Sequence, residues 1–257
     1  MTAVGDVEKL LYTWAPKELA EDWDNVGLLV GDPEREVKQV LVALDITEGV
    51  IDEAIGCGAD LIVAHHPVMN CAWHEVQTIR MDDLQGRKLT KLLEHRISAI
   101  CMHTNLDAAE GGVNDILAQM LGLGHPEALG EDGIGRIGIL EDEKTLAQYL
   151  PFVLKSLSCK GLRYRDGGKK VHRVAVGGGA CGCYIRDALH KGCDTFVTSD
   201  LKYNDFLDTE GINLIDAGHF PTEDVICAEI VRRIGEAFPS ILVQKSAVHA
   251  EVIQYYT

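Results

Sequence analysis

The sequence predicts an α/β fold made of two lobes of similar size. Helix-type and strand-type patterns alternate along the 257 residues, and the chain is long enough to bury a substantial core. The predicted strands are almost continuously apolar, as expected for a sheet covered by helices on both faces. A segment rich in glycine and acidic residues, 124–135, predicts a linker. We therefore divide the chain into lobes at 1–124 and 125–257.

The first lobe shows a βαβα pattern of about 125 residues, which is typical of a parallel sheet. Glycines close two of its predicted helices, at Gly58 and Gly124. The predicted helices are 7–14, 48–58, 86–96 and 111–124, and the predicted strands are 37–46, 60–66 and 97–103. Residues 21–32 predict a turn followed by a short strand, and the alternative is a loop that approaches the active cleft.

The second lobe repeats the alternation. A long amphipathic helix over 222–238 precedes a final strand over 240–246. The other predicted helices are 143–157, 183–192 and 203–211, and the other predicted strands are 135–140, 171–179, 193–200 and 212–219.

The charge of the chain limits its ligands. Forty acidic against 24 basic side chains give a formal net charge of −16. Nucleic-acid affinity depends on Lys and Arg that displace counterions, so we expect no nucleic-acid partner. A small anionic substrate is also repelled unless the site holds a local positive charge, which bound metal would provide.

The cysteine pattern argues against a structural zinc site. Eight cysteines are scattered and none forms a CxxC pair; only Cys181 and Cys183 are close. We expect buried, reduced thiols and a cytoplasmic protein. The N-terminal residues do not resemble a signal peptide, and no apolar run is long enough to span a membrane.

Polar side chains that can bind metal follow several predicted strands at their carboxyl ends, where open α/β sheets bind ligands. The strand 60–66 ends in His65 and His66, and the strand 97–103 ends in His103 and leads to Asp107. Two strands of the second lobe lead to the remaining candidates, which are Ser199, Asp200, His219 and Glu223.

Imidazoles and carboxylates without thiolates suit zinc, iron, manganese or cobalt. The candidate ligands are His65, His66, Asp107, His219 and Glu223. Five ligands are too many for one open catalytic zinc, but they suit two divalent ions that share a bridging carboxylate.

The adjacent His65 and His66 can converge only if the chain leaves the pleat, because neighbouring side chains of a strand point to opposite faces. Pro67 favours this, since it restricts His66 and lacks an amide hydrogen. We expect each imidazole to serve a different ion. The alternative is a pair of structural histidines at a strand end.

Two other candidates have structural alternatives. Thr222 is placed to cap the helix that follows, which would put Glu223 in a favourable first turn without any metal role. His103 is expected to orient a ligand or to contact substrate, and His103 or Glu223 could move protons in catalysis.

Residues 177–182, GGGACG, match the G-x-G-x-x-G pattern between a strand and a helix. The match lies deep in the chain, and the acidic residue expected about 20 positions later could only be Asp200. We favour a tight turn over a dinucleotide site and expect no organic cofactor here.

Six motifs in this order resemble the NIF-three-like family, whose members are often labelled GTP cyclohydrolase 1 type 2 homologues. They are DWDNVGLLVGD, VAHHPVM, HTNLDAAEGGVND, GGGACG, DTFVTSDLKYND and DAGHFPTE. The resemblance implies two α/β lobes around a dinuclear site and a ring-shaped homohexamer. It also implies the same five metal ligands, with Glu223 as the bridge. The family's T-G-D-x-K-Y-H segment is altered here, where Asn204 replaces the histidine.

These features favour a metal-dependent hydrolase acting on a nucleotide-like or phosphorylated small molecule. GTP ring opening is the specific reaction that the family label suggests. The alternative is a non-catalytic metal-binding or regulatory scaffold.

Overall fold

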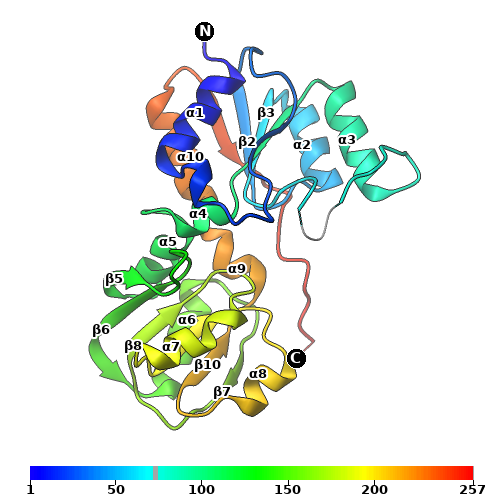
Figure 1. Ribbon diagram of the computed structural model, residues 1–257. Coiled ribbons are helices and arrows are strands. Elements are labelled where there is room, and N and C mark those ends of the chain that lie inside the picture. The colour runs from blue at the N-terminus through cyan, green and yellow to red at the C-terminus, as the bar shows by residue number, and fades with distance from the viewer. Residues whose placement is uncertain (72–74, 257) are drawn as a thin grey trace. The chain divides into compact units, whose positions relative to one another are not determined.

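The computed structural model describes residues 1–71 and 75–256, which form two compact units (Figure 1). The first unit combines Met1–Ala109 with Ile226–Ala250. The second contains Glu110–Val225 and the chain from Glu251 onward. Each unit has its own mixed sheet and its own hydrophobic core.

The first sheet has the strand order β1-β4-β3-β2-β11. Its members are β1 (Gly27–Val30), β2 (Gln39–Ala43), β3 (Leu61–Ala64), β4 (Ser98–Cys101) and β11 (Leu242–Lys245). All neighbours are parallel except β1, which runs antiparallel to β4. The residues of β3 and β4 are all buried, which agrees with the near-continuous apolar runs that predicted them.

Helices cover both faces of the first sheet (Figure 1). One face carries α1 (Val4–Trp14) and α10 (Val225–Ala237), and the other carries α2 (Glu48–Cys57) and α3 (Leu84–Glu94). Thr47 caps α2 by accepting from the Val50 amide, and Gly58 ends α2 in the left-handed conformation, as predicted. The short η1 (Lys17–Leu19) and α4 (Thr104–Ala108) complete the unit.

The second sheet has the strand order β5-β6-β8-β9-β10-β7. Its members are β5 (Gly124–Ala128), β6 (Arg136–Lys144), β7 (Arg163–Arg165), β8 (Val171–Val176), β9 (Thr195–Thr198) and β10 (Asn213–Asp216). Only β8, β9 and β10 are mutually parallel. The helical elements are α5 (Val113–Met120), α6 (Leu146–Ser156), η2 (Gly182–Tyr184), α7 (Ile185–His190), α8 (Tyr203–Asp208) and α9 (His219–Glu223).

The bounds of the two units differ from those of the predicted lobes, 1–124 and 125–257. The first unit contains a second segment, Ile226–Ala250, from late in the chain. The predicted linker contains β5, an exposed edge strand that pairs antiparallel with β6. The predicted last strand, β11, does not join the second sheet; it pairs in parallel with β2. The chain therefore returns to complete the first sheet, and α10 returns with it. Local patterns cannot reveal such a return, because it depends on pairing between distant segments.

No helix among residues 1–71 and 75–256 is long and apolar enough to cross a membrane.

Candidate metal centre

His65 and His66 stand where the chain leaves β3. Their amides both donate to the carbonyl of Leu44, over 3.2 and 3.0 Å, whereas a regular ladder gives each amide its own acceptor. The two imidazoles consequently lie together, with ring centroids 5.0 Å apart. The expected departure from the pleat is confirmed.

His103 follows β4 and joins this pair. Its ring centroid lies 5.1 Å from that of His65 and 5.6 Å from that of His66. The potential ligand atoms of the three histidines lie within 4.8 Å of one another. Asp107, on α4, places Oδ1 3.6 Å from Nε2 of His65, and both side chains are buried. The first unit thus gathers four of the predicted site residues.

Each imidazole of this group has an oxygen acceptor at Nδ1. The carbonyl of Met102 lies 2.8 Å from Nδ1 of His65, Asp45 Oδ1 lies 2.7 Å from that of His66, and Asp24 Oδ1 lies 2.9 Å from that of His103. A carbonyl can only accept, so His65 carries its proton on Nδ1. This leaves Nε2 as the metal-binding atom, which is the usual arrangement of metal-ligating histidines.

The two orienting carboxylates are ionised. Burial alone would raise the pKa of Asp24, but hydrogen bonds from His103 and Thr104 and the charge of His103 lower it to about 2. Burial would likewise raise the pKa of Asp45, but His249 and His66 hold it far below its usual range. His249 Nε2 lies 3.2 Å from the second oxygen of Asp45.

The second unit contributes His219 and Glu223, which lie one turn apart on α9. Nε2 of His219 is 2.8 Å from Oε2 of Glu223, and its Nδ1 is 2.6 Å from Oδ2 of Asp200. Burial alone would lower the pKa of His219, but these two carboxylates raise it to about 11. At neutral pH a proton therefore lies between Nε2 of His219 and Oε2 of Glu223, where a metal ion could be bound.

The expected cap at Thr222 is wrong. Thr222 lies inside α9, and its hydroxyl donates to the carbonyls of Gly218 and His219 and accepts from the amide of Gly179. The chain begins a short helix at His219, before α10, because Gly218 can adopt a positive φ of 87°. Glu223 is therefore at the end of α9, and the favourable first-turn position does not explain it.

The GGGACG loop covers Glu223. A Cβ on Gly179, whose φ is +64°, would lie 2.0 Å from Oε1 of Glu223. The amides of Gly177, Gly178 and Gly179 donate to Val197, Asn114 and Thr222, respectively. These amides are already engaged within the protein, so the loop is built as a tight turn and not as a phosphate cradle. Asp200, the acid that the dinucleotide pattern would need, contacts His219 instead.

Sequence reasoning missed the orienting roles of Asp24, Asp45, Asp200 and His249. Asp45 and Asp200 follow β2 and β9 closely, so the rule of strand carboxyl ends could have selected both. Asp24 lies in the loop before β1, and His249 lies beyond β11. Asp24 lies within the DWDNVGLLVGD motif, which does not itself indicate an orienting role, and His249 lies in no motif.

The fold and these side chains define a class: a mixed α/β protein with two sheets, whose histidine and carboxylate clusters can bind a metal ion. The chain belongs to the Duf34/NIF3 (NGG1p interacting factor 3) family, whose model matches residues 2–254. This confirms the resemblance found in the motifs.

Individual proteins and solved structures are similar to this chain over most of its length. A protein of Clostridium acetobutylicum named GTP cyclohydrolase 1 type 2 homolog is 38% identical over 230 residues, which cover 86% of this chain and 85% of the relative. The crystal structure of a Bacillus cereus protein related to NIF3 is 25% identical, with a TM-score of 0.92 over 100% of this chain and 99% of that one. A hypothetical protein from Staphylococcus aureus is 28% identical, with a TM-score of 0.89 over 99% of both chains.

Proposed function

We propose that this protein binds two divalent metal ions and hydrolyses a nucleotide-like or phosphorylated small molecule. The proposed ligands are His65, His66, Asp107, His219 and Glu223, with Glu223 as the bridge. The observation that supports this best is the common orientation of the imidazoles. In both units, an oxygen acceptor at Nδ1 directs Nε2 toward neighbouring carboxylate or imidazole groups.

The ligand count supports two ions, because five side chains with water in the remaining positions suit a pair of divalent ions. His219 and Glu223 alone are too few for a stable site, and the first unit alone offers one carboxylate, Asp107, to its histidines.

The residue types leave zinc, iron, manganese and cobalt as candidate ions. Such ions, when bound, supply Lewis acidity and a water nucleophile at neutral pH. Their charge also offsets the −16 of the chain for an anionic substrate.

The protein's own groups supply proton transfer and orientation. His103 is held through Nδ1 by the ionised Asp24, so its Nε2 can take up or deliver a proton. The Asp24 carboxylate also accepts from the amide and the hydroxyl of Thr104, which fixes its own position. We propose His103 and Glu223 as the catalytic residues.

The reaction suggested by the relatives' name is hydrolytic opening of a guanine nucleotide ring. The test is a turnover screen of nucleotides and phosphoesters, with protein reconstituted with each of the four metals. We expect turnover with at least one metal and its loss in a His65→Ala, Glu223→Ala double variant. Metal binding without turnover above that variant would instead support a metal-binding or regulatory scaffold.

We further propose a cytoplasmic homohexamer. The family resemblance supports the ring, and the scattered cysteines without a CxxC pair suit a reducing compartment. Light scattering should give about six times the chain mass of 28.1 kDa. A monomeric mass at micromolar concentration would contradict the hexamer.

A further inference from the structure

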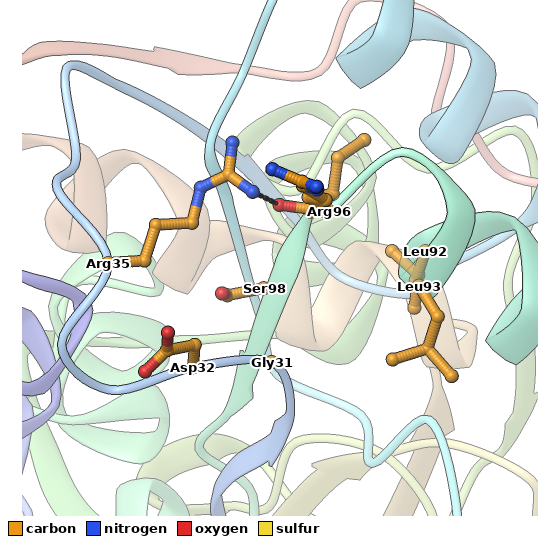
Figure 2. Close-up of a pocket in the computed structure, with 8 residues that line it drawn as sticks. Gly31, Asp32, Arg35, Leu92, Leu93, Arg96 and Ser98 are labelled. Atoms are coloured by element: carbon orange, nitrogen blue, oxygen red, sulfur yellow. Dashed lines mark hydrogen bonds between the residues drawn. The ribbon is translucent and has the colours of Figure 1, made fainter.

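A pocket of about 490 Å³ lies in the first unit and is lined by residues around the start of β4 (Figure 2). Ser98 begins β4, whereas His103 follows the other end of that strand. The loop after β1 supplies Gly31, Asp32 and Arg35, and the end of α3 leads to Arg96. The pocket is therefore separate from the proposed metal ligands, and the proposed hydrolase activity does not use it.

Two arginines converge on this pocket. Figure 2 shows Arg35 extending from its loop to Arg96, whose carbonyl oxygen accepts from Arg35 Nη1. Arg35 Nη2 also lies 3.4 Å from Oδ1 of Asp60. A guanidinium has five N–H donors in a rigid fork, so these contacts fix its position and leave donors for a ligand.

Arg96 stands where α3 ends. The amides of Arg96 and Ile97 donate back to the carbonyls of Leu93 and Leu92, and Arg96 has a φ of +56°. This is the position at a helix end that favours glycine. The end of α3 thus places Arg96, which is one of the residues that line the pocket.

Ser98 provides a second, independent observation. The residue is 1% exposed, and its hydroxyl has no hydrogen-bond partner in the described part of the chain. A Cβ on Gly31 would lie 2.3 Å from this hydroxyl, so glycine is required to make room for it. A buried hydroxyl without a partner is unfavourable, and an oxygen of a ligand would satisfy it.

We propose that this pocket binds a small organic acid. Its carboxylate or phosphate group would contact Arg35 and Arg96, with the Ser98 hydroxyl beneath them. Its apolar part would rest on Leu93, which lines the pocket and is 54% exposed. Arg35 and Arg96 provide a local attraction for an anion in a chain with a net charge of −16, although Asp32 also lines the pocket.

The experiment titrates the full chain with inorganic phosphate and, separately, with hexanoate, followed by calorimetry. We expect saturable binding of at least one probe, weakened about tenfold or more in Arg35→Gln and Arg96→Gln. Tighter binding of hexanoate would identify a carboxylate ligand with an apolar tail, and tighter binding of phosphate would identify a phosphate ligand.

Three further variants distinguish binding at this pocket from binding at the general surface or at the proposed metal site. Arg186→Gln removes the same charge from the exposed surface of α7 and should bind normally. Glu223→Gln removes a proposed metal ligand and should also bind normally at the pocket. Ser98→Ala should raise the melting temperature of the free protein and weaken probe binding. Absence of binding for both probes would overturn the proposal, and so would an affinity in Arg96→Gln and Ser98→Ala that equals that of the unaltered protein.

Discussion

Asp45 Oδ1 lies 2.7 Å from Nδ1 of His66, so this carboxylate determines which nitrogen of the imidazole is available for metal. His249 holds the second oxygen of Asp45 at 3.2 Å. His66 is therefore part of a chain of three interacting side chains, His249, Asp45 and His66.

Asp45→Asn should weaken metal binding about 10- to 100-fold, because the amide loses the charge that orients His66 and raises its basicity. Competition with a chromophoric chelator measures this affinity. Asp52→Asn is the matched control, since Asp52 makes a surface ion pair with Lys91. Equal affinity in both variants would show that Asp45 has no role in binding metal.

His103→Gln should retain the bound metal and lose most of the turnover, about 100-fold, if His103 moves protons. Asp24→Asn should lower turnover in the same direction, because it removes the acceptor at Nδ1 of His103. Metal content is measured by elemental analysis alongside the rate. A loss of one equivalent of metal in His103→Gln would instead assign His103 as a ligand.

Metal binding should release protons at neutral pH and should become tighter as the pH rises. Burial opposes the protonation of His219, but Glu223 and Asp200 raise its pKa to about 11, so an ion must displace this proton. Calorimetry in two buffers of different ionisation enthalpy measures the release. Asp200→Asn should reduce it, and an unchanged proton count would refute the assignment to His219.

The raised pKa of His219 should also make the stability of the metal-free protein depend on pH. Because the folded-state pKa lies above the ordinary value of 6.5, the ion pairs of His219 stabilise the fold fully below pH 6.5. This stabilisation is lost as the pH rises toward 11. Urea unfolding of metal-free protein between pH 6 and 10 should show the decline, which Glu223→Gln should diminish.

Gly179→Ala should weaken metal binding as well as stability. The new Cβ would meet Oε1 of Glu223 at 2.0 Å and would also adopt a positive φ. Gly192→Ala is a close control, since its φ is +72° and nothing lies within 4 Å of its Cβ. Both variants should lose about 1 kcal/mol from the backbone strain. Only Gly179→Ala should lose metal affinity, and equal metal affinity in the two variants would contradict the packing argument.

The parts of the fold that depend on local pattern were predictable from the sequence. The buried strands β2, β3 and β4 and the helices between them follow from apolar runs and from end signals such as Thr47 and Gly58. The return of β11 to β2 was not predictable, since it joins residues about 200 positions apart. The position of His249 beside Asp45 depends on that return.

The candidate ligands were predictable because parallel strands bring their carboxyl ends to one edge. His65, His66 and His103 come together in the first unit for this reason. The orienting acids were harder to find, because Asp24 comes from a segment whose sequence favours a turn and a short strand over a loop at the active cleft. The cap predicted at Thr222 was wrong. Its position in the sequence fits a helix cap, but a short helix already begins after Gly218.

The central proposal is that metal ions are bound at Nε2 of His65, His66 and His219, whose imidazoles are oriented by oxygen acceptors at Nδ1. Anomalous diffraction from crystals grown with manganese or zinc tests it most directly. The proposal predicts two peaks, bounded by His65, His66, Asp107, His219 and Glu223. Peaks at other residues, or none at all, would contradict it.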